Sequence, residues 1–207
     1  MQTNETITIF KTPFSREYWK ASCSELKSVK ALAVVALLMA LEIVISTIYI
    51  PLPVYGTQRI YFSFLVVAFI GMLYGPVVSF WAAFIGDLLG FMIHPQGAFF
   101  FGYIITAICG ALIFSFFLYR TRITITKIII CKLTINMLVN VCMNSLWDSM
   151  ILGNGYLPLL IARIPKNLLM LPIEVILLCT VFTMIIPVLK REHLLNYAPF
   201  DKKIKWF

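Results

Sequence analysis

Residues Ile60–Ile93 read IYFSFLVVAFIGMLYGPVVSFWAAFIGDLLGFMI, an apolar block with a single charged side chain. One α-helix of this length would be about 50 Å long, whereas the hydrocarbon core of a bilayer is roughly 30 Å thick. Gly75 and Pro76 stand near the middle, and proline cannot continue the hydrogen bonds of a helix. The block therefore predicts two short membrane helices, Ile60–Tyr74 and Pro76–Ile93.

Four further apolar stretches are long enough to cross a membrane. They are Val29–Ile50, Gly97–Tyr119, Thr126–Leu152 and Leu159–Leu189. The 207-residue chain is 61% hydrophobic and 13% charged, and its mean hydropathy is +0.93. Soluble domains are about half apolar and a quarter charged. The sequence predicts an all-α integral membrane protein with six transmembrane helices, in a single membrane domain over residues 1–207.

Basic residues gather in the segments that six crossings place on one side of the membrane. They are Lys11, Arg16, Lys20, Lys27 and Lys30 before the first helix, Arg120, Arg122, Lys127 and Lys132 after the fourth, and Lys190, Arg191, Lys202, Lys203 and Lys205 after the sixth. Loops rich in Lys and Arg stay in the cytoplasm. We expect both termini to be cytoplasmic, with a segment 1–28 and a tail 191–207 flanking a bundle over 29–190. Arg59, Arg163 and Lys166 fall on the opposite side.

The fifth predicted helix carries a polar stripe at membrane depth. Its members, Asn136, Asn140, Asn144, Trp147 and Asp148, share one helical face by their spacing. Polar groups in lipid are costly and usually face the interior of the bundle or a water-filled site. One alternative is hydrogen bonding between helices, which suits a lone asparagine. The whole stripe favours a wall of a ligand site.

The sixth helix opens with Arg163, Lys166 and Asn167, which share a face with Glu174 farther along. The two cations lie near the outer end, where they would form the rim of a site for an anionic group. Alternatively they extend to the outer lipid headgroups. For Glu174 the pattern leaves charge balance inside the bundle and a position near lipid equally open.

The third helix ends in GDLLGF, in which Asp87 needs a partner at membrane depth. That partner could be an amino-substituted heteroaromatic ligand, or one of the cations Arg59, Arg163 and Lys166. The outer loop 51–62 combines prolines, a glycine, aromatics and a cation, which suits a lid over an outward-facing site. The loop around 94–97 is a plausible companion.

Ala33, Ala36 and Ala40 share one face of the first helix. Small residues let another helix pack closely in lipid, either within the bundle or from a partner subunit.

No motif for chemistry accompanies these features. The chain has no G-x-x-x-x-G-K-[ST] motif for nucleotide hydrolysis and no zinc-protease or serine-hydrolase motif. Its five cysteines form no C-x-x-C pair, and its two histidines predict no metal site. We expect no cofactor and no enzymatic activity. A small membrane protein with a polar face but no source of energy points to a transport subunit.

Several stretches carry a family resemblance. They are FSREYW at Phe14–Trp19, the segment Ser24–Glu42, RIYFSF at Arg59–Phe64, GMLYGP at Gly71–Pro76, GDLLG at Gly86–Gly90, NVCMNSLW at Asn140–Trp147 and RIPKNLLMLP at Arg163–Pro172. In order and spacing they resemble the substrate-binding S components of energy-coupling factor (ECF) vitamin transporters, specifically the folate-specific one. The first helix departs from a plain apolar span at Glu42, to which neither motif nor pattern assigns a role.

This resemblance implies a six-helix subunit of a bacterial plasma membrane that binds folate from outside. Its partners would be a membrane coupling subunit, which docks on Ala33, Ala36 and Ala40, and two cytoplasmic ATPases. The implied ligand positions are Arg59, Asp87, Phe91, Asn140, Asn144, Trp147, Arg163, Lys166 and Asn167. Asp87, Asn140 and Asn144 would read the pterin edge, Trp147 or Phe91 would stack on a ring, and the three cations would face the glutamate carboxylates.

Three other hypotheses remain open at this point. The first is an S component for another vitamin, such as riboflavin. The second is a small membrane enzyme with Asp87 or Asp148 as acid or base, although the sequence offers no nucleophile–base pair. The third is a membrane scaffold that binds no ligand.

Overall fold

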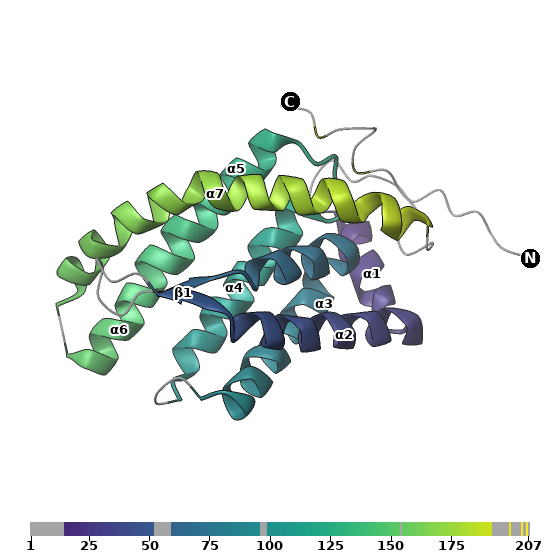
Figure 1. Ribbon diagram of the computed structural model, residues 1–207. Coiled ribbons are helices and arrows are strands. Elements are labelled where there is room, and N and C mark those ends of the chain that lie inside the picture. The colour runs from purple at the N-terminus through teal and green to yellow at the C-terminus, as the bar shows by residue number, and fades with distance from the viewer. Residues whose placement is uncertain are drawn as a thin grey trace, which may run out of the picture.

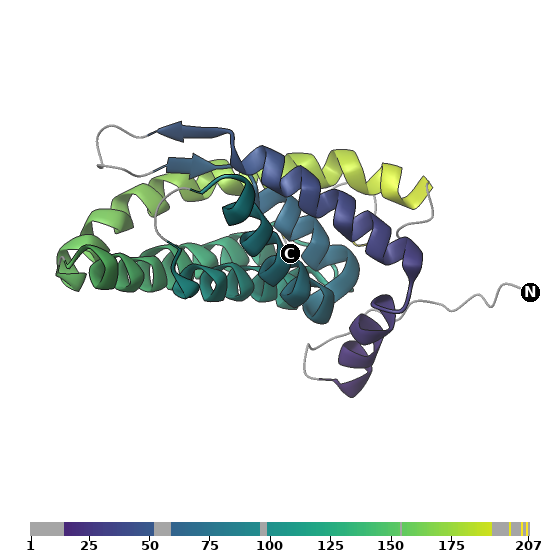
Figure 2. The same ribbon diagram turned by 90° about the horizontal axis from the view of Figure 1, so that it is seen from below.

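The computed structural model describes residues 15–51, 59–95, 99–153 and 155–191, together with residues 199, 204 and 206. In chain order the elements are α1 (Arg16–Glu25), α2 (Val29–Ser46), β1 (Tyr49–Pro51), β2 (Arg59–Tyr61), α3 (Phe64–Ile93), α4 (Phe101–Leu118), α5 (Ile125–Thr134), the π-helix η2 (Ile135–Met143), α6 (Asn144–Leu152) and α7 (Tyr156–Arg191). The β1–β2 hairpin and α1 lie at opposite ends of the bundle (Figure 1, Figure 2). Five helical stretches are long and apolar enough to cross a membrane: α2, α3, α4, the continuous helix α5–η2–α6, and α7.

Helix α3 is broken at Gly75, which has a φ of 76°, and the chain folds back there. Ser115 of α4 establishes the reversal because it contacts both halves of α3. Its backbone N lies 3.1 Å from the position of a Cβ on Gly71, and its Oγ lies 2.9 Å from Ser79 Oγ. In an unbroken helix Gly71 and Ser79 would be about 12 Å apart. The predicted pair of helices on either side of Gly75 is confirmed, which gives six membrane helices.

Helix α1 covers this reversal. Ser22 is fully buried, and its Oγ donates a hydrogen bond to the carbonyl of Tyr74 (2.9 Å) and accepts one from the N–H of Val77 (3.0 Å). These bonds satisfy backbone groups that lose their helical partners at the break, where Pro76 has no N–H to donate. The segment before the first membrane helix is therefore part of the folded bundle.

Described residues toward both ends of the chain, in α1 and at Pro199, meet the same end of the bundle. Arg120, just after α4, pairs with Glu25 of α1 at 3.6 Å. The N–H of Ile123 in the α4–α5 loop donates to the carbonyl of Pro199 at 2.9 Å. The prediction that both termini lie on one side is confirmed, and the basic residues make that side cytoplasmic.

The two helices that flank the first outer loop are shorter than predicted. Helix α2 ends at Ser46 rather than at Ile50, and α3 begins at Phe64, four residues later than expected. The strands β1 and β2 take their place and pair antiparallel, with Tyr49 opposite Tyr61. The expectation was wrong because apolar character alone does not separate a helix from a strand. β-Branched and aromatic residues favour strands, and a proline pushes the residue before it into an extended conformation.

The other spans agree with the prediction to within four residues at each end. The fifth helix contains an unexpected feature, because its middle, Ile135–Met143, is a π-helix. Such segments are rare and occur frequently at functional sites. A π-helix has more residues per turn than an α-helix, so it changes the direction in which the polar stripe points.

Candidate functional site

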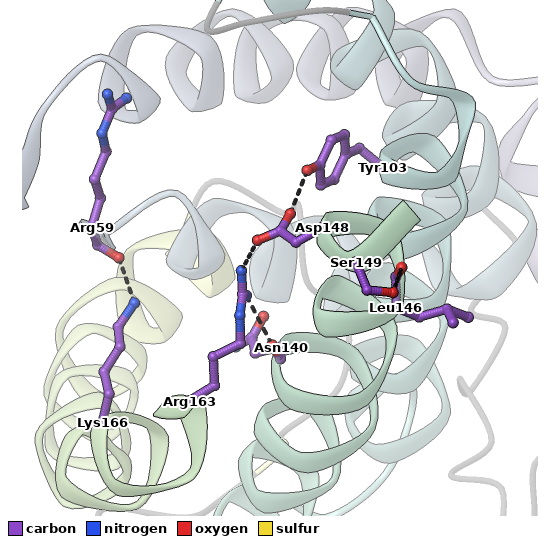
Figure 3. A network of polar contacts seen from close by, with 8 residues as sticks. All are labelled: Arg59, Tyr103, Asn140, Leu146, Asp148, Ser149, Arg163 and Lys166. Atoms are coloured by element: carbon purple, nitrogen blue, oxygen red, sulfur yellow. Dashed lines mark hydrogen bonds and ion pairs between the residues drawn. The ribbon is translucent and has the colours of Figure 1, made fainter. Parts of the chain in front are cut away.

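An ion pair joins α6 to α7 at the end of the bundle that carries the β1–β2 hairpin. The Arg163 guanidinium pairs with the Asp148 carboxylate, whose other oxygen accepts a hydrogen bond from the Tyr103 hydroxyl of α4 at 2.7 Å. Arg163 also donates to the backbone carbonyl of Asn140 at 3.3 Å. Figure 3 shows these groups, which come from the four elements α4, η2, α6 and α7, pointing toward one another. The predicted residues Arg163, Asp148 and Asn140 are therefore brought together.

Trp147 lies beside this pair, between α6 and α4. Its indole N–H donates to the Thr106 hydroxyl at 2.9 Å, and its ring lies 5.7 Å from that of Phe100. A Cβ on Gly102 would lie 2.7 Å from Cδ2 of Trp147, so glycine is needed for this approach. The indole is half-buried and offers an apolar surface next to charged groups.

Lys166 and Arg59 meet, but not through their charges. The Lys166 ammonium donates to the backbone carbonyl of Arg59 at 2.8 Å, which ties α7 to β2. The Arg59 guanidinium lies 4.4 Å from the ring centre of Tyr49 on the neighbouring strand. Figure 3 shows that the Arg59 guanidinium points away from Lys166. Three predicted cations thus surround this end of the bundle in different orientations.

The asparagines of the stripe differ in their surroundings. The Asn140 amide donates to Oδ1 of Asn136 at 3.1 Å, and Asn167 donates to the carbonyl of Arg163 at 2.9 Å. Oδ1 of Asn144 is buried and has no hydrogen-bond partner among the residues that the structure describes. Leaving a buried acceptor unpaired costs about 1–3 kcal/mol, so Asn144 has an unused capacity to bind a donor.

Asn136 faces α7 rather than the ion pair at the outer end. It is fully buried and donates to Glu174 (2.8 Å) and to the carbonyl of Asn167 (3.3 Å). Glu174 also pairs with Lys132 at 3.2 Å, so its role is charge balance inside the bundle. The placement of Lys132 among the cytoplasmic basic residues was wrong, because it is 1% exposed. Its signal in the sequence was the four-residue spacing Lys132, Asn136, Asn140.

Asp87 and Phe91 stand apart from these contacts. Within the described part of the chain Asp87 forms no salt bridge, and Arg163 pairs with Asp148 instead. Phe91 packs edge-on against Phe99, with ring centres 5.1 Å apart. Gly86 precedes Asp87 in α3. A Cβ on Gly86 would lie 3.5 Å from the carboxylate of Glu42 on α2. Glu42 and Asp87 therefore share the boundary between α2 and α3.

Other predicted features lie at the surface or outside the described residues. Ala33, Ala36 and Ala40 are all exposed on α2. Residues 52–58 and 96–98 of the two predicted outer loops are not among the described residues. Tyr103 and Thr106 were missed by the sequence analysis, although their spacing on α4 puts both on one face. Single hydroxyls in an apolar helix give little signal.

Comparisons with known proteins agree with this architecture. Residues 26–190 match the family described as "ECF-type riboflavin transporter, S component". The folate transporter FolT of Clostridium novyi is 32% identical over 179 residues, which cover 86% of this chain and 100% of that protein. The folate transporter FolT of Leuconostoc mesenteroides is 31% identical over 148 residues, which cover 68% of this chain and 77% of that protein.

A solved structure resembles the fold as well. The crystal structure of FolT bound with folic acid superposes with a TM-score of 0.67 and 25% sequence identity, covering 73% of this chain and 91% of that chain. The family match spans most of the membrane domain, and the relatives align over most of their own length. The chain therefore belongs to the S components of the energy-coupling factor transporters, a family of multi-pass membrane transport subunits.

Proposed function

We propose that this chain is the folate-binding subunit of an ECF uptake transporter, which captures folate outside the cell and delivers it inward. The observation that carries the proposal is the gathering of amides, an indole and cations at the outer end of the bundle. The relatives named folate transporters support it, as does the structural likeness to FolT bound with folic acid.

The chemistry of folate fits the residues at this end of the bundle. Folate is a flat heteroaromatic ring with donors and acceptors on its edge and a tail of two carboxylates. Asn140 and Asn144 offer amide groups for the ring edge, and Trp147 offers an apolar face for stacking. Arg163 and Lys166 supply positive charge for the carboxylates, and hydrogen bonds to charged groups are the stronger kind. Asn167, Arg59, Asp87 and Phe91 remain proposed contacts of the same ligand.

The proposal includes a coupling subunit and two ATPases as partners. Support comes from the exposed alanine face of α2, formed by Ala33, Ala36 and Ala40. In lipid, small side chains permit close approach of a second helix. Because the chain carries no nucleotide-hydrolysis motif, the energy for transport would come from those partners.

Riboflavin is the second candidate ligand. The family description that matches residues 26–190 names a riboflavin transporter, and riboflavin is also a flat heteroaromatic with several acceptors. It differs from folate in having no carboxylates. A site that uses Arg163 and Lys166 to bind carboxylates should therefore prefer folate.

A ligand titration tests the proposal. Detergent-purified protein is titrated separately with folic acid and riboflavin while tryptophan fluorescence is followed. We expect folic acid to bind more tightly, and Asn144→Ala and Arg163→Ala each to weaken it. Preference for riboflavin would overturn the choice of folate, and absence of binding by folded protein would favour a scaffold. Unchanged folate affinity in both variants would remove the proposed site.

A further inference from the structure

A buried ion pair lies deeper in the bundle than the proposed ligand contacts. Lys132 of α5 is 1% exposed, and its ammonium lies 3.2 Å from Oε2 of Glu174 on α7. The ammonium also sits 4.2 Å from the centre of the Phe64 ring. Burying two charges is costly, and apolar residues of similar volume often stabilise a protein as well or better. The pair therefore calls for an explanation beyond stability.

One oxygen of this pair determines how the next amide must point. Oε2 of Glu174 accepts a hydrogen bond from Asn136 at 2.8 Å. A carboxylate paired with an ammonium can only accept, so Asn136 must present its NH₂ group to Glu174. The other hydrogen of that NH₂ group is directed at the carbonyl of Asn167 at 3.3 Å. Oδ1 of Asn136 is consequently left to face Asn140.

The constraint then passes to Asn140. Because the atom of Asn136 that faces Asn140 is Oδ1, an acceptor, Asn140 must donate from its NH₂ group. Nδ2 of Asn140 lies 3.1 Å from Oδ1 of Asn136. Oδ1 of Asn140 is the atom left over, and it accepts no hydrogen bond from the residues that the structure describes. One turn farther along, Oδ1 of Asn144 is buried and likewise unpaired within the described chain. Two neighbouring asparagines thus offer acceptors.

We propose that the Lys132–Glu174 pair is a positioning device that sets the hydrogen-bond polarity of the ligand wall, so that Asn140 presents an acceptor to N–H donors on a heteroaromatic ring. The inference rests on the proposed function, because it assigns a role within the same site. The π-helix Ile135–Met143 holds Asn136 and Asn140 in the arrangement that links them. Neither charge touches the ligand in this scheme.

Two ligands that differ only in ring polarity test this device. Folic acid carries an N3–H donor beside a 4-oxo acceptor, and its 4-amino analogue aminopterin reverses that pattern. The quantity measured is the ratio of the aminopterin Kd to the folic acid Kd. Variants are the neutral double variant Lys132→Met/Glu174→Gln and, independently, Asn136→Ala, which leaves the ion pair intact. Glu25→Gln, at the cytoplasmic ion pair with Arg120, is the matched control.

In wild type we expect folic acid to bind more tightly. In Asn136→Ala the Asn140 amide is free to rotate, so the Kd ratio should fall by about tenfold toward unity, the value of one hydrogen bond. In the neutral double variant the amide at position 174 can donate as well as accept, but the carbonyl of Asn167 still accepts from Asn136, so the ratio should fall in the same direction by less. Glu25→Gln should keep the wild-type ratio. A ratio within about twofold of wild type in folded Asn136→Ala would overturn the positioning role while leaving folate binding intact. Wild-type protein that binds neither ligand would instead overturn the proposed function.

Discussion

Arg163 and Asp148 form an ion pair that joins the start of α7 to α6 on the outer side of the bundle. The pair is held on both sides, because Asp148 also accepts from Tyr103 and Arg163 also donates to the carbonyl of Asn140. The guanidinium of Arg163 is therefore already oriented, and its charge is partly neutralised, before an anionic ligand binds. Its remaining N–H groups are the ones available to a carboxylate.

The first prediction concerns Asp148→Asn. An amide keeps the shape of the side chain but removes the charge that orients Arg163, and charged hydrogen bonds are worth about 1.5–3 kcal/mol. We expect the folic acid Kd to rise by about tenfold or more, measured by fluorescence titration. Arg122→Ala, an exposed arginine at the cytoplasmic end, should leave the Kd unchanged. Equal affinity in wild type and Asp148→Asn would show that the pair does not orient a ligand contact.

The second prediction uses two glycines of α4. In Gly102→Ala the new Cβ would overlap the Phe100 ring and would lie 2.7 Å from Cδ2 of Trp147, so both rings must move. Overpacking of this kind costs about 1–3 kcal/mol, and we expect a lower thermal midpoint together with weaker folic acid binding. Gly110→Ala is the matched control, since nothing lies within 4 Å of its Cβ position. If Gly102→Ala binds folic acid as well as Gly110→Ala does, Trp147 is not a ligand contact.

The sequence predicted the six helices because each apolar run has a length set by the bilayer, and because Pro76 marks the reversal between two of them. It could not predict the β1–β2 hairpin, since aromatic and β-branched residues such as Tyr49 and Ile60 are compatible both with a membrane helix and with a strand. Membership of the site was only partly predictable. Helical spacing selected Asn140, Trp147 and Asp148, whereas the contacts of these residues depend on the π-helix.

The third prediction concerns the reversal at Gly75. A Cβ there would lie 2.8 Å from the Tyr119 ring and 2.9 Å from Ser22 Oγ, in a backbone conformation with positive φ. Gly75→Ala should therefore lower the thermal midpoint of the detergent-purified protein strongly. Gly153→Ala is the comparison, because Gly153 has a positive φ of 68° in the left-handed α region and open space around it, whereas Gly75, with ψ of −171°, lies in a region almost restricted to glycine. Gly153→Ala should lose about 1–2 kcal/mol, the cost of the left-handed backbone alone. Equal losses in the two variants would contradict the tight packing at Gly75.

The fourth prediction separates binding from transport. Ala36→Trp and Ala40→Trp add bulk to the exposed face of α2, far from the ion pair of Arg163. We expect folic acid binding by the purified variants to equal that of wild type, while uptake of labelled folate by cells that express the whole transporter is abolished. Ile176→Trp on the exposed face of α7 controls for added bulk in lipid and should transport normally. Normal uptake by both α2 variants would refute the docking face.

The fifth prediction concerns pH. Burial raises the pKa of the Glu25 carboxyl above its ordinary value of 4.5, and the nearby charge and hydrogen bond of Arg120 offset part of this effect. The folded state thus binds this proton more tightly than the unfolded state does. The stability that Glu25 contributes is fully present below about pH 4.5 and is lost as pH rises through the folded pKa. Glu25→Gln should flatten that decline in thermal midpoint, and the exposed Glu17→Gln should not. Parallel profiles for wild type and Glu25→Gln would contradict this assignment.

The bonds of Ser22 carry a consequence for how the protein is made. Its two partners, the carbonyl of Tyr74 and the N–H of Val77, lie 52 and 55 residues later in the chain. During synthesis α1 therefore leaves the ribosome well before the turn it covers exists, and it has to remain at the cytoplasmic surface until two more helices have been inserted. Helix α1 therefore reaches its native place only after elements that follow it in the chain are already in the membrane.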